Sequence, residues 1–235
     1  MRRLLNPTIL ALAATLLPAA PSLAQEFRAK AVVQRQPVDK LEGNGNVVVW
    51  LTPVGVSAPQ APIVHPKLVQ KNKRFEPHLL VVPVGTLVDF PNQDPFFHNV
   101  FSLYKGKRFD LGLYEAGSSR AVRFDRPGVS FIFCNIHPEM SAAVVAVDTP
   151  YYSVSNAAGE IQIRDIPPGR YRMEVWYERS SPDALSHLAR QVSIPLEGTA
   201  MTLEVPEVIA ASVPHKNKYG ADYEKSGGYN PGKPD

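Results

Sequence analysis

The chain of 235 residues contains only one cysteine, Cys134, so no disulfide can form within it. It also has no apolar stretch after residue 24 that is long enough to cross a bilayer. Its formal charge is +3, and Arg2 and Arg3 supply two of these charges, which leaves residues 25–235 at +1. A charge so close to zero gives no electrostatic basis for binding nucleic acid. We therefore expect no disulfide scaffold, no stable membrane span and no nucleic-acid partner.

The first 24 residues have the features of an export signal. Met1-Arg2-Arg3 is a short basic start, the stretch 4–20 is mostly apolar, and Ser22-Leu23-Ala24 is a small-x-small cleavage site ahead of Gln25. We therefore expect residues 1–24 to be a signal peptide and the protein to be periplasmic or otherwise exported. In an oxidising compartment, a lone thiol is expected to pair with another molecule, to react or to hold a ligand.

The rest of the chain has the pattern of an all-β protein. Valine-rich or alternating runs, separated by Gly, Pro, Asn and Asp turn signals, predict strands at 47–50, 79–84, 121–124, 129–133, 142–147, 159–163 and 170–177. The one helical turn expected lies at 182–189, where Ser181 or Asp183 can cap its start. This distribution favours β-sandwiches or barrels over an α/β architecture.

Four side chains with metal-binding chemistry lie near two of these strands. Cys134, His137 and Met140 form a Cys-x-x-His-x-x-Met cluster where a strand should turn back, and His98 lies in Phe97-His98-Asn99-Val100. Thiolate and thioether sulfurs favour Cu(I), and imidazoles accept both copper oxidation states. The four donors therefore suit one copper ion that cycles between these states.

The segment 66–148, about a third of the chain, resembles the cupredoxin family. The resemblance is carried by Phe75-Glu76-Pro77, the run 79–90 followed by Asn92, the histidine at 98, and the hairpin from Phe124-Asp125-Arg126-Pro127-Gly128 to Cys134. It implies a Greek-key β-sandwich with one type 1 (blue) copper ion. Plastocyanin and amicyanin belong to this family, and the short ligand loop is most similar to that of amicyanin.

The resemblance implies a role for each donor. His98, Cys134 and His137 match the equatorial copper ligands, and Met140 matches the weak axial ligand. The backbone N–H of Asn99 matches the family's hydrogen-bond donor to the cysteine sulfur, which tunes the potential. A short loop carrying three ligands should keep the copper geometry nearly constant between oxidation states.

Other interpretations exist for the same residues. A lone Cys or Met is often a buried apolar side chain, and a Cys-His pair can be a nucleophile for acyl transfer. Zinc also binds one cysteine and two histidines, although structural zinc prefers four strong ligands. The first-row affinity order and the position of Met140 favour copper. His78, in the strand that follows Pro77, is expected to be an ordinary strand histidine rather than a second metal site.

The two flanks carry a second resemblance. The stretch 153–175, with Asn156-Ala157-Ala158-Gly159 and Pro167-Pro168-Gly169-Arg170-Tyr171, resembles the later half of a carboxypeptidase-regulatory-like module, which is a small prealbumin-like β-sandwich. The stretch 26–58 offers the earlier half. We therefore expect 26–58 to combine with 149–205 in one discontinuous sandwich, with the copper domain 66–148 inserted, and 206–235 to form a flexible tail. We expect this flank to have a structural or docking role.

These observations predict a protein that carries single electrons between a donor and an acceptor redox protein and that is not an enzyme. No histidine cluster suggests the second copper centre that a nitrite-reducing or oxygen-reducing enzyme needs. His137, beside Pro138, is the expected exit for the electron, ringed by Pro95 and Phe96. The alternatives are a copper carrier or sensor that delivers the ion without redox cycling, and a structural protein with a vestigial site.

Overall fold

The structure is a computed structural model that describes residues 25–35, 43–62, 64–103, 106–196, 198, 200–208 and 216–223. The predicted signal peptide, 1–24, lies outside these residues. Among the described residues, no helix combines the length and the apolar character needed to span a membrane.

The regular secondary structure of the described chain is almost entirely strand, which confirms the all-β prediction. Its only α-helix, α1 (Pro182–Ser186), has Ser181 as its N-cap, and the Ser181 hydroxyl accepts a hydrogen bond from the N–H of Ala184. The early and late strands are β1 (Gln25–Gln34), β2 (Val48–Pro53), β12 (Tyr152–Val154), β13 (Glu160–Ile166), β14 (Gly169–Trp176), β15 (Arg190–Ile194) and β16 (Met201–Pro206). The middle strands are β3 (Val69–Lys71), β4 (Arg74–Glu76), β5 (Leu79–Pro83), β6 (Leu87–Pro91), β7 (His98–Ser102), β8 (Phe109–Tyr114), β9 (Ser119–Arg123), β10 (Gly128–Phe133) and β11 (Ser141–Val147).

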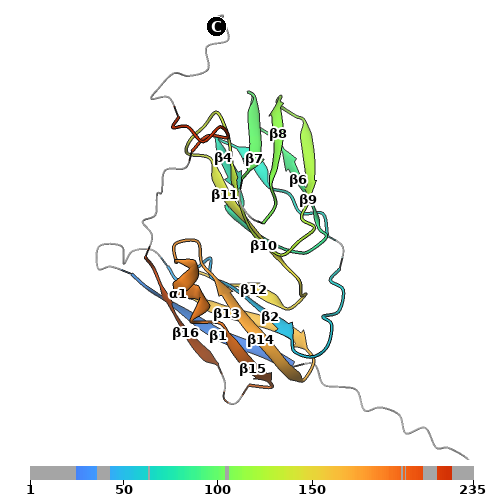
Figure 1. Cartoon of the computed structure of the whole chain (residues 1–235), viewed down its shortest axis with the longest axis vertical. Helices are drawn as coiled ribbons and strands as arrows, with labels where there is room; N and C mark the ends of the chain where they lie inside the picture. The colour runs from blue at the N-terminus through green and yellow to red at the C-terminus, as the bar shows by residue number, and fades with distance from the viewer. Residues whose placement is uncertain are drawn as a thin grey trace, which may run out of the picture.

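The early and late strands form one β-unit, called here the flanking unit, which lies below the other strands in Figure 1. Its two sheets have the strand orders β13-β1-β16 and β12-β2-β14-β15. Alternate side chains of β1, Phe27, Ala29, Ala31 and Val33, are buried in the core between the sheets. Each sheet therefore combines strands from both ends of the sequence. That 26–58 and 149–205 fold as one domain remains a prediction.

The chain leaves and re-enters the flanking unit at neighbouring strands. It leaves after β2 and returns at β12, and these two strands are antiparallel partners with Trp50 opposite Tyr152. Closely spaced points of departure and return are what an inserted segment requires.

The middle strands form a second β-unit, called here the middle unit. A five-stranded sheet with the order β5-β11-β10-β7-β8 faces the β3–β4 and β6–β9 pairs. Bridges from Lys67 to Asp89 and from Gln70 to Asn92 join the segment around β3 to the segment around β6. The core between these layers contains Cys134 and Met140 among its buried residues.

Strand β11 explains how the two units meet. Its residues Ala142 to Val147 are all buried, because the strand is covered on both faces. Ala142, Val144 and Ala146 belong to the core of the middle unit, whereas Val145 and Val147 pack with Val48 of the flanking unit. The units therefore share an apolar junction.

Of the expected tail, 206–235, the structure describes residues 206–208 and 216–223, and that the whole range forms a flexible tail stays a prediction. Residues 216–223, red in Figure 1, lie against the middle unit. The Lys218 N–H donates to Oδ1 of Asn135 at 2.9 Å, the Lys218 ammonium pairs with Asp110 at 2.9 Å, and the Tyr223 hydroxyl donates to the Cys134 carbonyl at 2.7 Å. Specific polar contacts, rather than apolar periodicity, fix this segment.

Candidate metal centre

The predicted donors come from the ends of neighbouring strands. His98 is the first residue of β7, Cys134 directly follows β10, and β7 and β10 are adjacent antiparallel strands. The loop after Cys134 is closed by its own backbone: the Met140 N–H donates to the His137 carbonyl at 3.0 Å, and the Cys134 N–H donates to the Met140 carbonyl at 3.3 Å. The tight loop thus brings His137 back towards Cys134.

Three of the four predicted donors converge on one point. The Cys134 sulfur lies 3.7 Å from Nδ1 of His98 and 3.6 Å from Nδ1 of His137. One donor atom from each residue lies within 4.8 Å of the other two. Nitrogen and sulfur ligands bind a metal at about 2.0 and 2.3 Å, so two ligands of one ion lie about 3–4 Å apart. The side chains therefore fit a single ion.

The predicted axial ligand, Met140, lies in the same region. Its side chain is fully buried in the core of the middle unit, together with Cys134. The two backbone hydrogen bonds described above join Met140 to Cys134 and His137. Its role as a copper ligand remains a prediction.

Burial controls the protonation of Cys134 and His137. It raises the pKa of the Cys134 thiol, although the backbone N–H groups of Asn99, Ile136 and His137 donate towards the sulfur and oppose that rise. The Asn99 N–H, which the family resemblance predicts as a donor to this sulfur, is one of the groups that oppose the rise in pKa. Burial, reinforced by the nearby His98 ring, lowers the pKa of His137. These pKa shifts favour a neutral imidazole at His137 and a protonated thiol at Cys134. A bound metal would displace the thiol proton.

Aromatic rings surround the donors. The centroid of the Phe96 ring lies 5.2 Å from that of His98 and 5.6 Å from that of His137, and the two imidazole centroids are 4.9 Å apart. The Lys73 ammonium lies 5.7 Å from the Phe96 centroid. His98 is completely buried, whereas His137 is only partly buried. The site therefore has a closed side at His98 and a more open side at His137.

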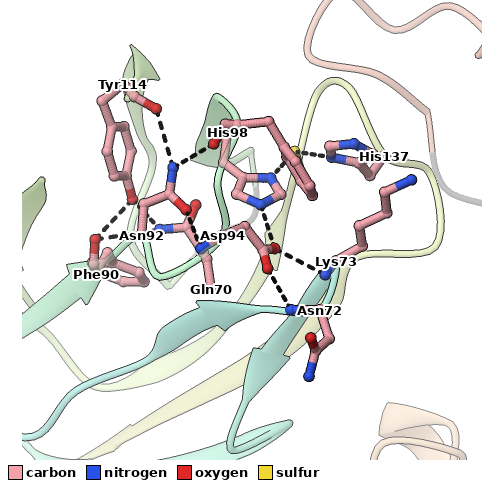
Figure 2. Close-up of polar contacts among 11 residues, drawn as sticks. Gln70, Asn72, Lys73, Phe90, Asn92, Asp94, His98, Tyr114 and His137 are labelled. Atoms are coloured by element: carbon pink, nitrogen blue, oxygen red, sulfur yellow. Dashed lines mark hydrogen bonds and ion pairs between the residues drawn. The ribbon is translucent and has the colours of Figure 1, made fainter. Parts of the chain in front are cut away.

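The sequence analysis did not identify Asp94, which the structure places at the back of the site (Figure 2). Its Oδ2 atom lies 2.8 Å from Nε2 of His98, the ring nitrogen that points away from Cys134. Burial disfavours the carboxylate, but hydrogen bonds from the Lys73 N–H, the His98 ring and the Asn72 N–H outweigh it and lower the pKa of Asp94. The only sequence signal is an aspartate four residues before a candidate ligand.

Further buried polar groups hold the segment 92–96, which contains Asp94 (Figure 2). Oδ1 of Asn92 accepts the Asp94 N–H at 3.0 Å, and its amide nitrogen donates to the Phe96 carbonyl at 2.8 Å. The same amide donates to the Tyr114 carbonyl at 3.4 Å, and the Tyr114 hydroxyl donates to the Phe90 carbonyl at 2.9 Å. Residues 92–96 are thereby fixed between β6 and β7.

The structure places His78 away from this cluster. Its Nε2 lies 2.6 Å from a carboxylate oxygen of Glu178, and its Nδ1 lies 3.0 Å from the Ser141 carbonyl. Both ring nitrogens of His78 are hydrogen-bonded to oxygen atoms, and the residue lies in the bend between β4 and β5 rather than within a strand as the sequence predicted.

No family model matches the sequence, and no curated protein matches it. Among solved structures, the chain is similar to a purple cupredoxin from Nitrosopumilus maritimus, with 24% identity over 35% of this chain and 99% of that chain and a TM-score of 0.32. It is also similar to a mutant of amicyanin in the Cu(I) form, with 18% identity over 42% of this chain and 98% of that chain and a TM-score of 0.34. A copper-containing nitrite reductase from Thermus scotoductus SA-01 is 22% identical over 50% of this chain and 28% of that chain, with a TM-score of 0.35.

Proposed function

We propose that this chain is an exported electron-transfer protein whose middle unit is a cupredoxin domain with one type 1 copper ion. His98, Cys134 and His137 are the equatorial ligands and Met140 is the axial ligand. The observation that carries the proposal is the convergence of one thiol and two imidazole nitrogens at 3.6–3.7 Å.

The donor set favours copper over zinc. A thiolate with two imidazoles and a weak thioether is the arrangement of blue-copper sites, whereas structural zinc sites are closed by four strong ligands. The Met140 thioether is a weak donor, and Asp94, the nearby carboxylate, is occupied by the outer nitrogen of His98. Bound copper would supply a one-electron couple at this position.

The protein's own residues limit rearrangement at the site. The loop from Cys134 to Met140 is closed by backbone hydrogen bonds, and His98 is held between Phe96 and Asp94. Three backbone N–H groups donate towards the Cys134 sulfur. Rigid ligands favour rapid electron transfer because little structure changes with the charge.

The open side of the site suits brief contact with redox partners. His137 is partly exposed, and Pro138 and Pro95 beside it are exposed. Phe97 follows Phe96, whose ring centroid lies 5.6 Å from that of His137, and its side chain is 52% exposed. An apolar patch of this kind matches the small contacts of transient redox complexes. The electron would enter and leave through the His137 ring edge.

The flanking unit has a separate role in this proposal. We infer that it is a prealbumin-like sandwich that carries the copper domain as an insertion and docks or orients it. The apolar junction formed by Val48, Val145 and Val147 supports a fixed arrangement of the two units.

The test is a visible spectrum of residues 25–235 with Cu(II), combined with voltammetry. The proposal expects intense blue absorption from the thiolate–copper bond and a reversible one-electron wave. Cys134→Ser should abolish the colour, whereas the control His187→Asn, at the exposed C-cap of α1, should retain it. Copper binding without a reversible wave would instead indicate a delivery protein, and a colourless wild-type protein would refute a type 1 site.

A further inference from the structure

The Asp94 carboxylate is an anion held by three directed donors. Asp94 is 5% exposed. Its Oδ1 accepts the Asn72 N–H at 2.6 Å, and its Oδ2 accepts the Lys73 N–H at 2.9 Å. The third donor is the His98 ring, 2.8 Å from Oδ2. With donors on both oxygens, the ionised form satisfies every contact, whereas a carboxylic acid proton would face another donor.

Two of the donors come from a turn whose backbone shape suits an anion. Asn72 and Lys73 are the two residues between β3 and β4, with Lys71 opposite Arg74. Both have left-handed backbones, with φ angles of 53° and 54°. Successive N–H groups in such a turn point to the same side and form a small anion-binding concavity. The Asp94 carboxylate occupies this concavity (Figure 2).

The carboxylate also determines which nitrogen of His98 is available to a metal. If Nε2 donates to Asp94, the neutral ring carries its proton there, and Nδ1 presents a lone pair. That nitrogen is the one that faces the Cys134 sulfur, at 3.7 Å. The protein therefore prepares His98 for coordination before any metal arrives.

A negative charge one ring away from a metal stabilises the higher oxidation state more than the lower one. We propose that Asp94 is a positioning residue that fixes the His98 tautomer and lowers the reduction potential of the copper site. The effect on the reduction potential rests on the proposed function. The effect on the His98 tautomer does not, because the tautomer is a property of the metal-free protein.

The first experiment measures that tautomer directly. Long-range ¹H–¹⁵N NMR spectra of the copper-free wild-type protein at pH 8 should show His98 protonated at Nε2 and unprotonated at Nδ1. Protonation at Nδ1 would overturn the proposal, whether or not the protein binds copper. A protein with the expected tautomer but no copper affinity would contradict the proposed function and leave the positioning of His98 intact.

The second experiment removes the negative charge of the Asp94 carboxylate. Asp94→Asn should raise the reduction potential by at least about 59 mV, which corresponds to a tenfold loss of Cu(II) affinity relative to Cu(I) for a one-electron couple. In the copper-free variant, the Nε2 proton signal of His98 should weaken or shift.

The matched control is Asp125→Asn. Asp125 belongs to the same unit and pairs with the Lys107 ammonium at 2.8 Å and with Arg126, and neither partner is a candidate ligand or next to one. Its substitution should shift the potential much less than Asp94→Asn. Equal shifts would assign the effect to the general field of the protein and would overturn the specific role of Asp94. If Asp94→Asn does not fold, the His98 tautomer measured in the wild-type protein still tests the proposal.

Discussion

The imidazole of His78 and the carboxylate of Glu178 form an ion pair across the junction between the two units, with 2.6 Å between Nε2 and Oε2. His78 immediately precedes β5 of the middle unit, and Glu178 follows β14 of the flanking unit. Val48, Val145 and Val147 form the apolar part of the same junction. The junction therefore combines a buried apolar contact with a titratable contact at its edge.

This ion pair predicts a pH-dependent stability. The hydrogen bond to Glu178 raises the pKa of His78 above its ordinary value of 6.5, partly opposed by burial and supported by the Glu178 charge and the Ser141 carbonyl. A raised folded-state pKa means that the stabilisation is fully present below pH 6.5 and is lost as the pH rises through the folded-state pKa. Because His78 is about half exposed, the contribution should be below about 1 kcal/mol.

The measurement is urea unfolding of the wild type and His78→Asn at pH 5.5 and pH 8.5. The variant should lose stability relative to the wild type at the lower pH and much less at the higher pH. His187→Asn is the matched control, because His187 is the exposed C-cap of α1 and its ring hydrogen-bonds to the local Asp183 carbonyl. Parallel pH profiles for the wild type and His78→Asn would rule out the effect.

Replacement of His137 should separate electron exit from the rest of the site. His137→Ala removes the partly exposed candidate ligand but leaves His98 and Cys134 in the core. Copper affinity should fall by at least the roughly 10–100-fold that loss of an outer partner costs, while some copper remains bound. Electron exchange with a redox partner, measured by stopped flow on the copper-loaded fraction, should slow markedly. Unchanged rates would contradict exit through His137.

The early strands of the flanking unit should be required for its late strands to fold. β1 lies between β13 and β16, and the Phe27 side chain is fully buried in their core. Phe27→Ala should destabilise the flanking unit by about 3–5 kcal/mol, because it leaves a cavity between packed sheets. Deletion of 26–58 should abolish folding of 149–205, monitored by circular dichroism and proteolysis. A fragment 149–205 that folds unaided would disprove the discontinuous domain.

The C-terminal segment should restrain the ligand loop. Tyr223→Phe removes the hydrogen bond to the Cys134 carbonyl and should cost about 1 kcal/mol locally. Hydrogen exchange of the amides in 134–137 should then accelerate, and copper should dissociate faster. Tyr219→Phe is the control, because the Tyr219 side chain is 79% exposed. Equal exchange in both variants would show that residue 223 does not restrain the loop.

The candidate copper ligands could be proposed from the sequence because they lie in an ordered pattern next to recognisable strands. The run from Ala142 to Val147 indicated a strand, and the hairpin after Phe124 indicated where Cys134 would lie. Asp94 could not be identified in this way, because Asn-Gln-Asp-Pro reads as a solvated turn. Its role depends on Asn72 and Lys73, which only the pairing of β3 beside β6 brings to the carboxylate.

The contacts of residues 216–223 could not be predicted from the sequence for a related reason. Their composition, rich in Lys, Gly and Tyr, has no apolar periodicity and is typical of unstructured tails. Individual hydrogen bonds to Asn135 and Cys134 hold the segment instead. Such contacts leave no periodic trace in a sequence, because each depends on a single side chain meeting one distant group.

The contact between Tyr223 and Cys134 also sets an order of assembly. A ribosome makes residue 223 after all the described strands of the middle unit, the last of which ends at Val147. The cysteine loop therefore gains this restraint only after those strands have been made. Nascent chains truncated before residue 216 would carry the candidate ligands with a looser loop, so maturation of the centre is linked to synthesis of a segment outside the middle unit.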